Sequence, residues 1–325
     1  MNTDKKDLEA LSKMSHPRSS VVSSGADQMQ ASTRKLDFLV VGAEKCGTTW
    51  LADMLKQHPQ VFVPERKELH YFNRKFVEFP DLDNFNFDKP LDWYLSFYKD
   101  AAPGQVKGEI CPTYLWDLEA PSRIRDFEPR LKILILLRNP VERTFSAYRY
   151  YQQRGIIGRE ALKQAVVQYH NILIERSQYC AQVKRYLDLF PREQVRVWCL
   201  TKSGGMVSML KEVETFLGVD EFVPENASAR SNMTGEPRNW TLNRVLAYGR
   251  RAVRRYRVLA SFVDVMRGLS VDRRLEAVRR ENVSTAAPTE LSRMNEEEKL
   301  WMTRLLRPDV EQLESLLQFN LSEWK

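Results

Sequence analysis

The stretch GAEKCGTT, residues 42–49, follows an apolar run at 36–41 and leads into a helix-like segment. A buried strand, a glycine-bearing turn and a helix N-terminus together form an anion site, because unpaired backbone N–H groups and the helix dipole converge there. In the NTPase pattern G-x-x-x-x-G-K-[ST], a lysine directly follows the second glycine. Here Thr48 follows Gly47, and the lysine lies inside the turn as Lys45. The stretch predicts a phosphate-binding loop that departs from the NTPase form.

Short apolar segments alternate with helical patterns along the chain, which is typical of a parallel sheet covered by helices. The expected strands are residues 36–42, 106–110, 131–137 and 195–200. The 131–137 run is nearly all apolar, as expected for a central strand buried on both faces. The expected fold is therefore α/β, with a P-loop-like parallel sheet flanked by helices and a helical C-terminal extension.

A helix is expected directly after the 131–137 run. Asn139 suits its N-cap, Pro140 suits its first position, and Glu142 stands where a capping box places a glutamate. Further helical patterns cover about 160–175, 179–190, 203–218 and 294–317. The part from 238 to 325 is expected to be a helical and variable extension of the same domain.

The composition is that of an ordinary globular chain. At 325 residues it is long enough for one large α/β domain, which we expect to span 35–325. Residues 1–34 are rich in polar residues, contain no long apolar run, and are expected to form a disordered tail. The four cysteines are scattered without a C-x-x-C pair, which favours reduced thiols. Together these features predict a cytoplasmic, non-spanning protein.

A second anion site is suggested by Arg138, which ends the 131–137 run. Metal-dependent P-loop enzymes typically place a Mg²⁺-holding aspartate at such a strand end. Ser146 follows eight residues later, two turns into the expected helix. An arginine and a hydroxyl can form a phosphate pocket. The alternative is an arginine paired with a core carboxylate, and these two residues alone leave both interpretations open; the loop at 42–49 favours the phosphate pocket.

These residues carry a resemblance to a known family. Residues 45–51, KCGTTWL, resemble the 5′-phosphosulfate loop of the sulfotransferases, and residues 137–148, LRNPVERTFSAY, resemble their 3′-phosphate-binding segment. Residues 67–72, KELHYF, are similar to the K-E-x-H-F-F stretch of the heparan-sulfate type and its bacterial relatives. Segments 108–115 and 177–182 also fit that group, so the resemblance runs from about 36 to 238 in the family's order.

The resemblance implies a donor, 3′-phosphoadenosine 5′-phosphosulfate (PAPS), whose sulfuryl group passes to an acceptor hydroxyl or amine without a metal. Such a donor needs two anion pockets. The loop, with Lys45 and the Thr48 and Thr49 hydroxyls, would hold the 5′-phosphosulfate, and Arg138 with Ser146 would hold the 3′-phosphate. The full implied donor set is Lys45, Cys46, Gly47, Thr48, Thr49, Trp50, Arg138, Ser146 and Arg238.

The family match also implies the catalytic groups. Sulfuryl transfer needs in-line geometry and stabilisation of charge on the leaving oxygen, for which Lys45 is the natural group. Glu68 matches the family's general base. His70 lies two residues on and would share a face with Glu68 in an extended segment, so it is the second candidate for the base. Its alternative role is to orient the segment.

The acceptor is less defined by the sequence. Heparan-sulfate enzymes often have a lysine where Ile110 stands, so the chain leans towards the bacterial branch and away from a heparan acceptor. A hydroxyl of a carbohydrate, lipid or natural product is expected. Glu109 and Tyr114 are candidates for lining the acceptor cleft, and the alternative for Glu109 is a buried structural glutamate.

Residues 238–257 contain seven arginines and no acidic residue, with apolar residues at helical spacing. Such a helix covers the cleft, attracts an acidic acceptor, rests on an anionic membrane surface, or simply has a solvated face, which is the simplest interpretation. Two other functions stay open: a variant P-loop kinase using ATP and Mg²⁺, and a non-enzymatic basic module binding nucleic acid or membrane through 238–257. The chain has no recognisable nucleic-acid-binding motif, so no nucleic-acid partner is expected.

Overall fold

The structure is a computed structural model that describes residues 35–200, 205–228, 239–256 and 294–325. Residues 35–325 group as one compact unit. The tail expected at 1–34 and the donor contact expected at Arg238 lie outside the described residues.

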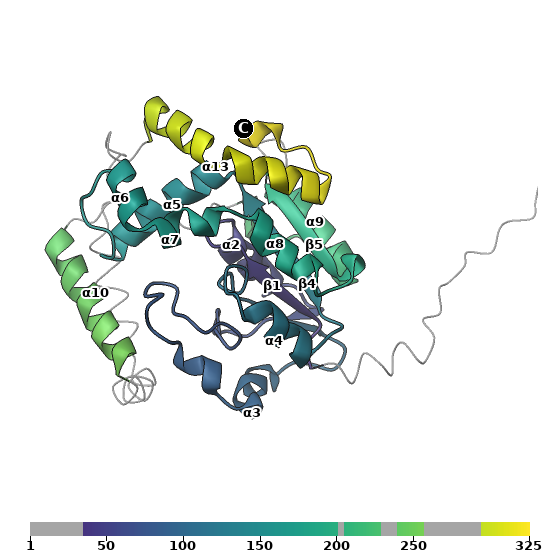
Figure 1. The fold of residues 1–325 in the computed structure, drawn as a ribbon. Coiled ribbons are helices and arrows are strands. Elements are labelled where there is room, and N and C mark those ends of the chain that lie inside the picture. Colours follow the sequence, from purple (N-terminus) through teal and green to yellow (C-terminus); the bar gives the residue numbers. More distant parts are fainter. Residues whose placement is uncertain (1–34, 201–204, 229–238, 257–293) are drawn as a thin grey trace, which may run out of the picture. The chain divides into compact units, whose positions relative to one another are not determined.

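A five-stranded parallel sheet lies at the centre of this unit, in the order β2-β3-β1-β4-β5 (Figure 1). The strands are β1 Phe38–Gly42, β2 Val61–Phe62, β3 Val106–Ile110, β4 Lys132–Arg138 and β5 Val195–Leu200. The predicted α/β fold is confirmed, and all four expected strands are present. The edge strand β2 was not expected, because two residues are too few to show a strand pattern.

The helices flank the sheet (Figure 1). Their bounds are α2 Thr48–Leu55, α3 Leu91–Leu95, α4 Ala120–Phe127, α5 Pro140–Gln153, α6 Leu162–Gln168, α7 His170–Leu173, α8 Cys180–Leu187, α9 Met206–Leu217, α10 Trp240–Arg255 and α13 Glu296–Leu317. Short 3₁₀ turns are η1 Phe85–Asp88, η2 Ser96–Tyr98, η3 Glu175–Ser177, η4 Arg192–Gln194, η5 Glu225–Ser228 and η7 Ser322–Trp324. The single helical stretch expected at 160–175 is wrong: it is broken at Tyr169, whose φ of −117° and ψ of 37° are not helical.

The C-terminal ends of β1 and β4 each carry a residue that determines the local backbone. Gly42 ends β1, and a Cβ placed there would lie 2.4 Å from Leu115 Cβ, so the strand passes too close to the neighbouring segment for any other residue. After β4, the Asn139 side chain accepts hydrogen bonds from the N–H groups of Val141 (3.0 Å) and Glu142 (3.3 Å), which confirms the expected N-cap of α5. The expected capping box is only half formed, because the Glu142 carboxylate pairs with an arginine instead.

The last helix is tied to the sheet-flanking helices. In α13, Asn295 and Glu298 form a complete capping box, with N···O distances of 2.8 and 3.1 Å. The Asp309 carboxylate accepts hydrogen bonds from the N–H groups of Tyr179 (2.6 Å) and Cys180 (3.2 Å) at the start of α8. The expected helical C-terminal part is therefore present in its described residues, and α13 supplies a cap for another helix.

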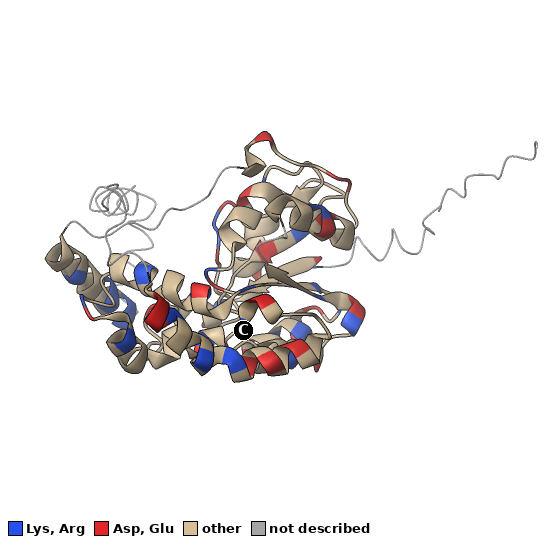
Figure 2. Ribbon diagram, turned by 90° about the horizontal axis from the view of Figure 1, so that it is seen from above, with Lys and Arg blue, Asp and Glu red and all other residues tan. Residues whose placement is uncertain are grey.

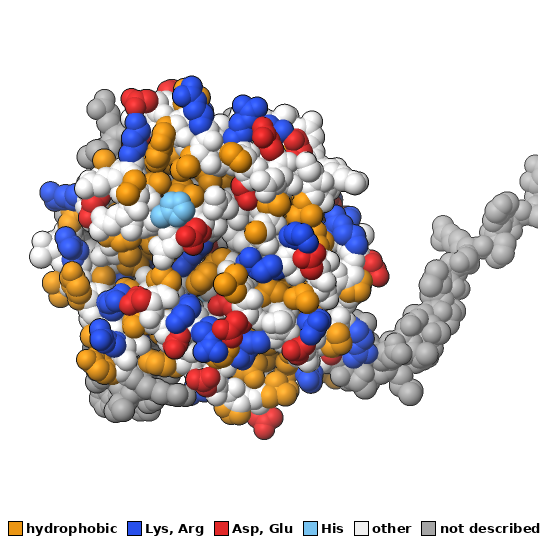
Figure 3. All heavy atoms as spheres, viewed as in Figure 1, with side chains coloured by type: hydrophobic (Ala, Val, Ile, Leu, Met, Phe, Trp, Pro, Cys, Tyr) orange, Lys and Arg blue, Asp and Glu red, His pale blue; other side chains and the backbone are white. Residues whose placement is uncertain are grey.

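The arginine-rich helix α10 is packed through several of its basic side chains. Arg250 and Arg254 pair with buried Glu78 at 3.5 and 3.1 Å, and Arg251 pairs with Asp81 at 3.0 Å. Figure 2 shows the basic positions along α10, at the left of the view. The simplest interpretation of this helix, a solvated basic face, is therefore wrong for Arg250 and Arg254, whereas Arg251 and its partner Asp81 are solvent-exposed. On the face drawn in Figure 3, basic and acidic side chains are interspersed instead of forming one large basic patch.

Two further properties concern the described residues as a whole. All four cysteines are free thiols. Over the described ranges, no helix is long and apolar enough to cross a membrane.

Candidate functional site

The loop between β1 and α2 contains two residues in the left-handed region. Lys45 has a φ of 68° and Gly47 has a φ of 85°, and α2 begins at the next residue, Thr48. A side chain at Gly47 would be strained, since a Cβ there would also lie 3.0 Å from Met206 Cε. The loop therefore turns sharply into the helix N-terminus, as the anion-site prediction requires.

Glu44 anchors this loop from inside. Its carboxylate accepts hydrogen bonds from Arg143 (3.0 Å), Arg176 (3.3 Å) and the Tyr151 hydroxyl (2.9 Å). Burial alone would raise the pKa of Glu44, but the charges of Arg176 and Arg143 outweigh burial and lower it. Glu44 is thus a charged structural group.

Lys45 is half-buried, and its Nζ lies 4.4 Å from the centroid of the Tyr150 ring. Burial lowers the pKa of Lys45, with Glu44 opposing that shift and nearby arginines adding to it. A lysine held in this environment gains stabilisation from an arriving anion.

Lys45 and Arg138 line the same cavity, which has a volume of about 320 Å³. Its other lining residues are Cys46, Gly47, Asn139, Glu142, Leu200, Met206, Glu323 and Trp324. The two cations predicted from separate motifs are thus brought together beside the N-terminus of α2. Arg138 Nε and Nη2 lie 2.9 and 2.8 Å from one Glu142 carboxylate oxygen, so this arginine has an exposed acidic partner, not a core one.

The other residues predicted to bind the sulfuryl donor differ in burial and in hydrogen-bond partners. Thr48 is buried, and the Trp50 indole N–H donates to the Ala227 carbonyl at 3.0 Å. Ser146 is half-buried on α5 and is not among the described residues that line the cavity. Their donor roles, including that of Ser146, stay predictions.

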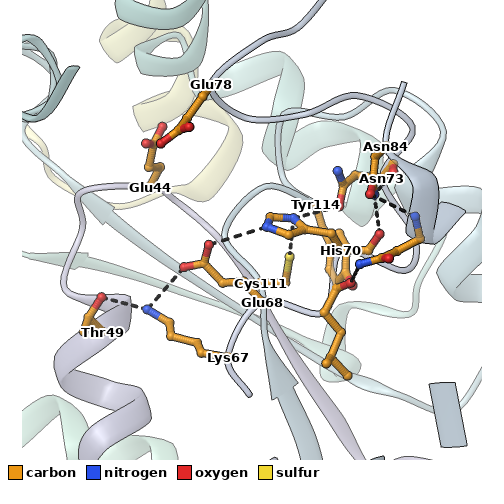
Figure 4. Close-up of polar contacts among 12 residues, drawn as sticks. Glu44, Thr49, Lys67, Glu68, His70, Asn73, Glu78, Asn84, Cys111 and Tyr114 are labelled. Carbon is orange, nitrogen blue, oxygen red and sulfur yellow. Dashed lines mark hydrogen bonds and ion pairs between the residues drawn. The ribbon is translucent and has the colours of Figure 1, made fainter. Parts of the chain in front are cut away.

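The predicted base lies in a second cluster, next to the loop helix (Figure 4). Lys67 Nζ donates to Thr49 Oγ1 at 2.7 Å and lies 3.4 Å from Glu68 Oε1. His70 Nε2 lies 3.7 Å from Glu68 Oε2. The expected extended backbone is wrong, because Glu68 and His70 have φ values of 59° and 54°, yet their side chains do face each other.

The His70 ring is also held from its other nitrogen. Nδ1 lies 3.2 Å from Asn73 Oδ1 and 3.5 Å from Cys111 Sγ. Burial lowers the pKa of His70, while the charge of Glu68 opposes that shift. The contacts on both nitrogens restrain the ring against Glu68.

Glu109 and Tyr114 are both buried, with exposed fractions of 2% and 0%. Burial contradicts the interpretation that they line the acceptor cleft, and the alternative of a buried structural glutamate is confirmed for Glu109. Over the described ranges, no group of three or more His, Cys, Asp or Glu side chains is arranged to hold a metal ion.

The comparison with known families agrees with this geometry. The family described as "Sulfotransferase domain" matches residues 35–198, half of the chain. The chain belongs to the sulfotransferase family. The resemblance stated from the loop and the 137–148 segment is thereby confirmed.

Relatives of this sulfotransferase-family chain include two human proteins. Heparan sulfate glucosamine 3-O-sulfotransferase 5 of Homo sapiens is 27% identical over 173 residues, covering 49% of this chain and 46% of that protein. Heparan sulfate glucosamine 3-O-sulfotransferase 6 of Homo sapiens is 33% identical over 139 residues, covering 41% and 37%. The chain thus matches less than half the length of these relatives.

A solved structure extends the likeness over most of the chain. The sulfotransferase from Alicyclobacillus acidocaldarius superposes with a TM-score of 0.63 at 25% identity, covering 89% of this chain and 98% of that one. The arrangement of the sheet and its flanking helices is therefore shared with a bacterial member of the family.

Several residues of the site were not predicted from the sequence. Lys67 stands beside Glu68 in the quoted KELHYF stretch, so its place there was an available signal. Arg143 shares a motif with Arg138, but the Arg143 side chain is fully buried whereas that of Arg138 is 38% exposed, and burial decides which of them faces the cavity. Trp324 gave no signal, because only the fold brings it to the loop.

Proposed function

We propose that this chain transfers the sulfuryl group of PAPS to an acceptor hydroxyl. One arrangement carries the proposal: Lys45 and Arg138 line one cavity at the N-terminus of α2, and Glu68 is joined to the same helix through Lys67 and Thr49. The expected binding site of an anionic donor and the base for the acceptor therefore lie at the same end of α2.

The chemistry of the cavity fits the donor. The loop N–H groups, the dipole of α2 and Lys45 would hold the 5′-phosphosulfate. Arg138 would hold the 3′-phosphate, with Ser146 and Arg238 as further candidates. Because Arg138 is engaged by Glu142 in this structure, the donor phosphate has to compete with that carboxylate or share the arginine with it.

In the transfer, one bond to sulfur forms, another breaks, and one proton leaves the acceptor. The acceptor oxygen attacks sulfur in line with the donor, an oxygen–sulfur bond forms, and the bond from sulfur to the 5′-phosphate oxygen breaks. The acceptor proton passes to the Glu68 carboxylate, acting as general base. Lys45 neutralises the charge that develops on the leaving phosphate oxygen.

Glu68 is favoured over His70 as the base because of its surroundings. Its carboxylate is partly exposed and lies between Lys67 and His70, which is a position from which it can accept a proton. His70 is restrained by Asn73 and Glu68, which suits an orienting role. The acceptor class we propose is a hydroxyl of a carbohydrate, lipid or natural product, and the names of the human relatives favour a glycan.

Calorimetry with adenosine 3′,5′-bisphosphate tests the donor. The bisphosphate should bind much more tightly than 5′-AMP, because only it can engage both cations. ATP with Mg²⁺ is the matched comparison for a variant P-loop kinase. Equal binding of the bisphosphate and 5′-AMP would remove the basis of the proposal, and tighter binding of ATP–Mg²⁺ would favour the kinase. Transfer of labelled sulfate from PAPS into a panel of acceptors then identifies the product.

A further inference from the structure

The segment that carries Glu68 and His70 has an unusual backbone. Both residues lie in the left-handed region, at φ values of 59° and 54°, and neither is a glycine. Such conformations persist only where surrounding contacts impose them. Leu69 lies between them, so the contacts of its backbone restrain both turns.

Two buried side chains, Glu109 in β3 and Tyr114 just after this strand, contact the backbone of the segment. The Leu69 N–H donates to Glu109 Oε1 at 2.9 Å, and the Tyr71 N–H donates to the Tyr114 hydroxyl at 3.0 Å. The Tyr114 hydroxyl in turn donates to Glu109, at 3.0 and 3.1 Å from its two oxygens. The Glu109 carboxyl group is therefore linked, directly and through Tyr114, to two backbone N–H groups of the segment.

The carbonyl groups of the same segment are held by two asparagines. Asn86 Nδ2 donates to the Leu69 carbonyl at 2.8 Å, and Asn84 Nδ2 donates to the His70 carbonyl at 2.5 Å. The asparagine contacts hold the carbonyls, whereas Glu109 is the group that holds the N–H between the two left-handed residues.

Glu109 is itself fixed near the C-terminal end of β3, an internal strand of the sheet. It pairs in register with Leu39 of β1, the strand that leads into the phosphate-binding loop. The Tyr94 hydroxyl of α3 donates to Glu109 Oε2 at 2.7 Å. The other titratable groups that act on it are Tyr98, Cys111, Tyr114 and Glu68. Burial raises the pKa of Glu109 to about 7, against the opposing hydrogen bonds of Tyr94, Tyr114 and the Leu69 N–H.

We propose that Glu109 is a positioning residue for the transfer reaction: by holding the Leu69 N–H it sets the two left-handed turns that direct Glu68 and His70 towards the loop helix. The proposal rests on the proposed function of Glu68. It differs from a purely structural role, in which loss of Glu109 would reduce the amount of folded protein and leave the folded protein fully active.

The test compares Glu109→Ala, Glu109→Gln and a matched control. Glu214→Ala is the control, because Glu214 on α9 is also a buried glutamate whose carboxylate accepts a backbone N–H, that of Phe222 at 3.3 Å. For each variant, kcat per folded molecule, KM for the acceptor, bisphosphate affinity and thermal stability are measured. Displacement of a reacting group by about 1 Å costs about 10²-fold in rate, so Glu109→Ala should lose kcat on this scale while bisphosphate affinity is kept. Glu109→Gln should recover most of the loss, because its amide oxygen can accept the Leu69 N–H.

A double variant shows whether Glu109 acts through Glu68. If it does, Glu68→Gln combined with Glu109→Ala should be no slower than Glu68→Gln alone, because residues that act as a unit are not additive. Wild-type kcat in folded Glu109→Ala, or an equal loss in Glu214→Ala, would overturn the proposal. If Glu109→Ala does not fold, Tyr114→Phe is used; it removes the acceptor of the Tyr71 N–H and should lower kcat likewise. Failure of the wild-type protein to bind the bisphosphate would instead refute the proposed function.

Discussion

Lys67 Nζ lies 2.7 Å from Thr49 Oγ1, so the segment that carries the proposed base is hydrogen-bonded to the helix that follows the phosphate-binding loop. The same ammonium lies 3.4 Å from Glu68 Oε1. One lysine thus couples the place where the donor is expected to bind with the group expected to take the acceptor proton.

The first prediction concerns this lysine. Lys67→Met keeps the length of the side chain but removes both contacts, and it should lower kcat by about 10²-fold through misplacement of Glu68. Bisphosphate affinity should change much less. Lys56→Met is a suitable control, because Lys56, which directly follows α2, also pairs with a glutamate, the fully exposed Glu65, at 3.4 Å. An unchanged kcat in Lys67→Met would show that the link is dispensable.

The second prediction separates the two candidate bases. Glu68→Gln keeps the size of the side chain and removes the proton acceptor, so turnover should fall by about 10²–10⁴-fold while the bisphosphate still binds. His70→Gln should be impaired less, since an orienting group is lost and the base remains. Steady-state kinetics and calorimetry on both variants decide the matter. Full activity in Glu68→Gln would move the base to His70 or elsewhere.

The fold and the loop could be predicted because their signals are local. A buried strand, a glycine turn and a helix start are encoded within residues 36–55, and the cap at Asn139 within four residues. Nearby residues determine the hydrogen bonds and burial in such segments, so the local sequence pattern is sufficient to predict them. The role of Arg143 could not be predicted in this way, because its partners come from the loop and from residues 172–177.

The hydrogen-bond partners of Glu109 and the packing of α10 could not be predicted for the same reason. Glu109 is polar and lies in a short strand, and only the docking of residues 67–72 onto β3 gives its carboxyl a function. In the sequence, Arg250 and Arg254 have the pattern of surface charges. Their buried partner, Glu78, is far away in sequence and is brought to them only by the fold. Long-range ion pairs leave no periodic pattern in a sequence.

The third prediction concerns the two phosphates of the donor. Hydrogen bonds to charged groups contribute about 1.5–3 kcal/mol, and the partial exposure of Arg138 favours the lower end. Arg138→Met should therefore weaken bisphosphate binding by about tenfold and leave 5′-AMP binding unchanged. Glu142→Gln should strengthen bisphosphate binding, because it frees Arg138 and removes a negative charge from the cavity. Calorimetry with both nucleotides is the measurement; equal losses for both in Arg138→Met would place the arginine at the 5′-phosphate.

The fourth prediction follows from the buried carboxyl of Glu109. Burial raises its pKa in the folded protein from 4.5 to about 7, so between these values the folded state binds a proton that the unfolded state has released. The contribution of Glu109 to the free energy of unfolding is therefore most favourable below pH 4.5, and it is lost as the pH rises to 7. The loss amounts to about 3 kcal/mol.

Glu109→Gln removes this titration, so the difference in unfolding free energy between the variant and the wild-type protein should shift in favour of the variant as the pH rises from 5 to 8. Urea unfolding at pH 5, 6, 7 and 8 measures that difference, and carboxyls common to both proteins cancel. Burial raises the pKa of Tyr94, Tyr98, Tyr114 and Cys111 well above this range, so these neighbours do not titrate in it. Parallel stability curves for the two proteins would show that Glu109 keeps one protonation state throughout, and its hydrogen bonds to Leu69 and Tyr114 would then be independent of pH.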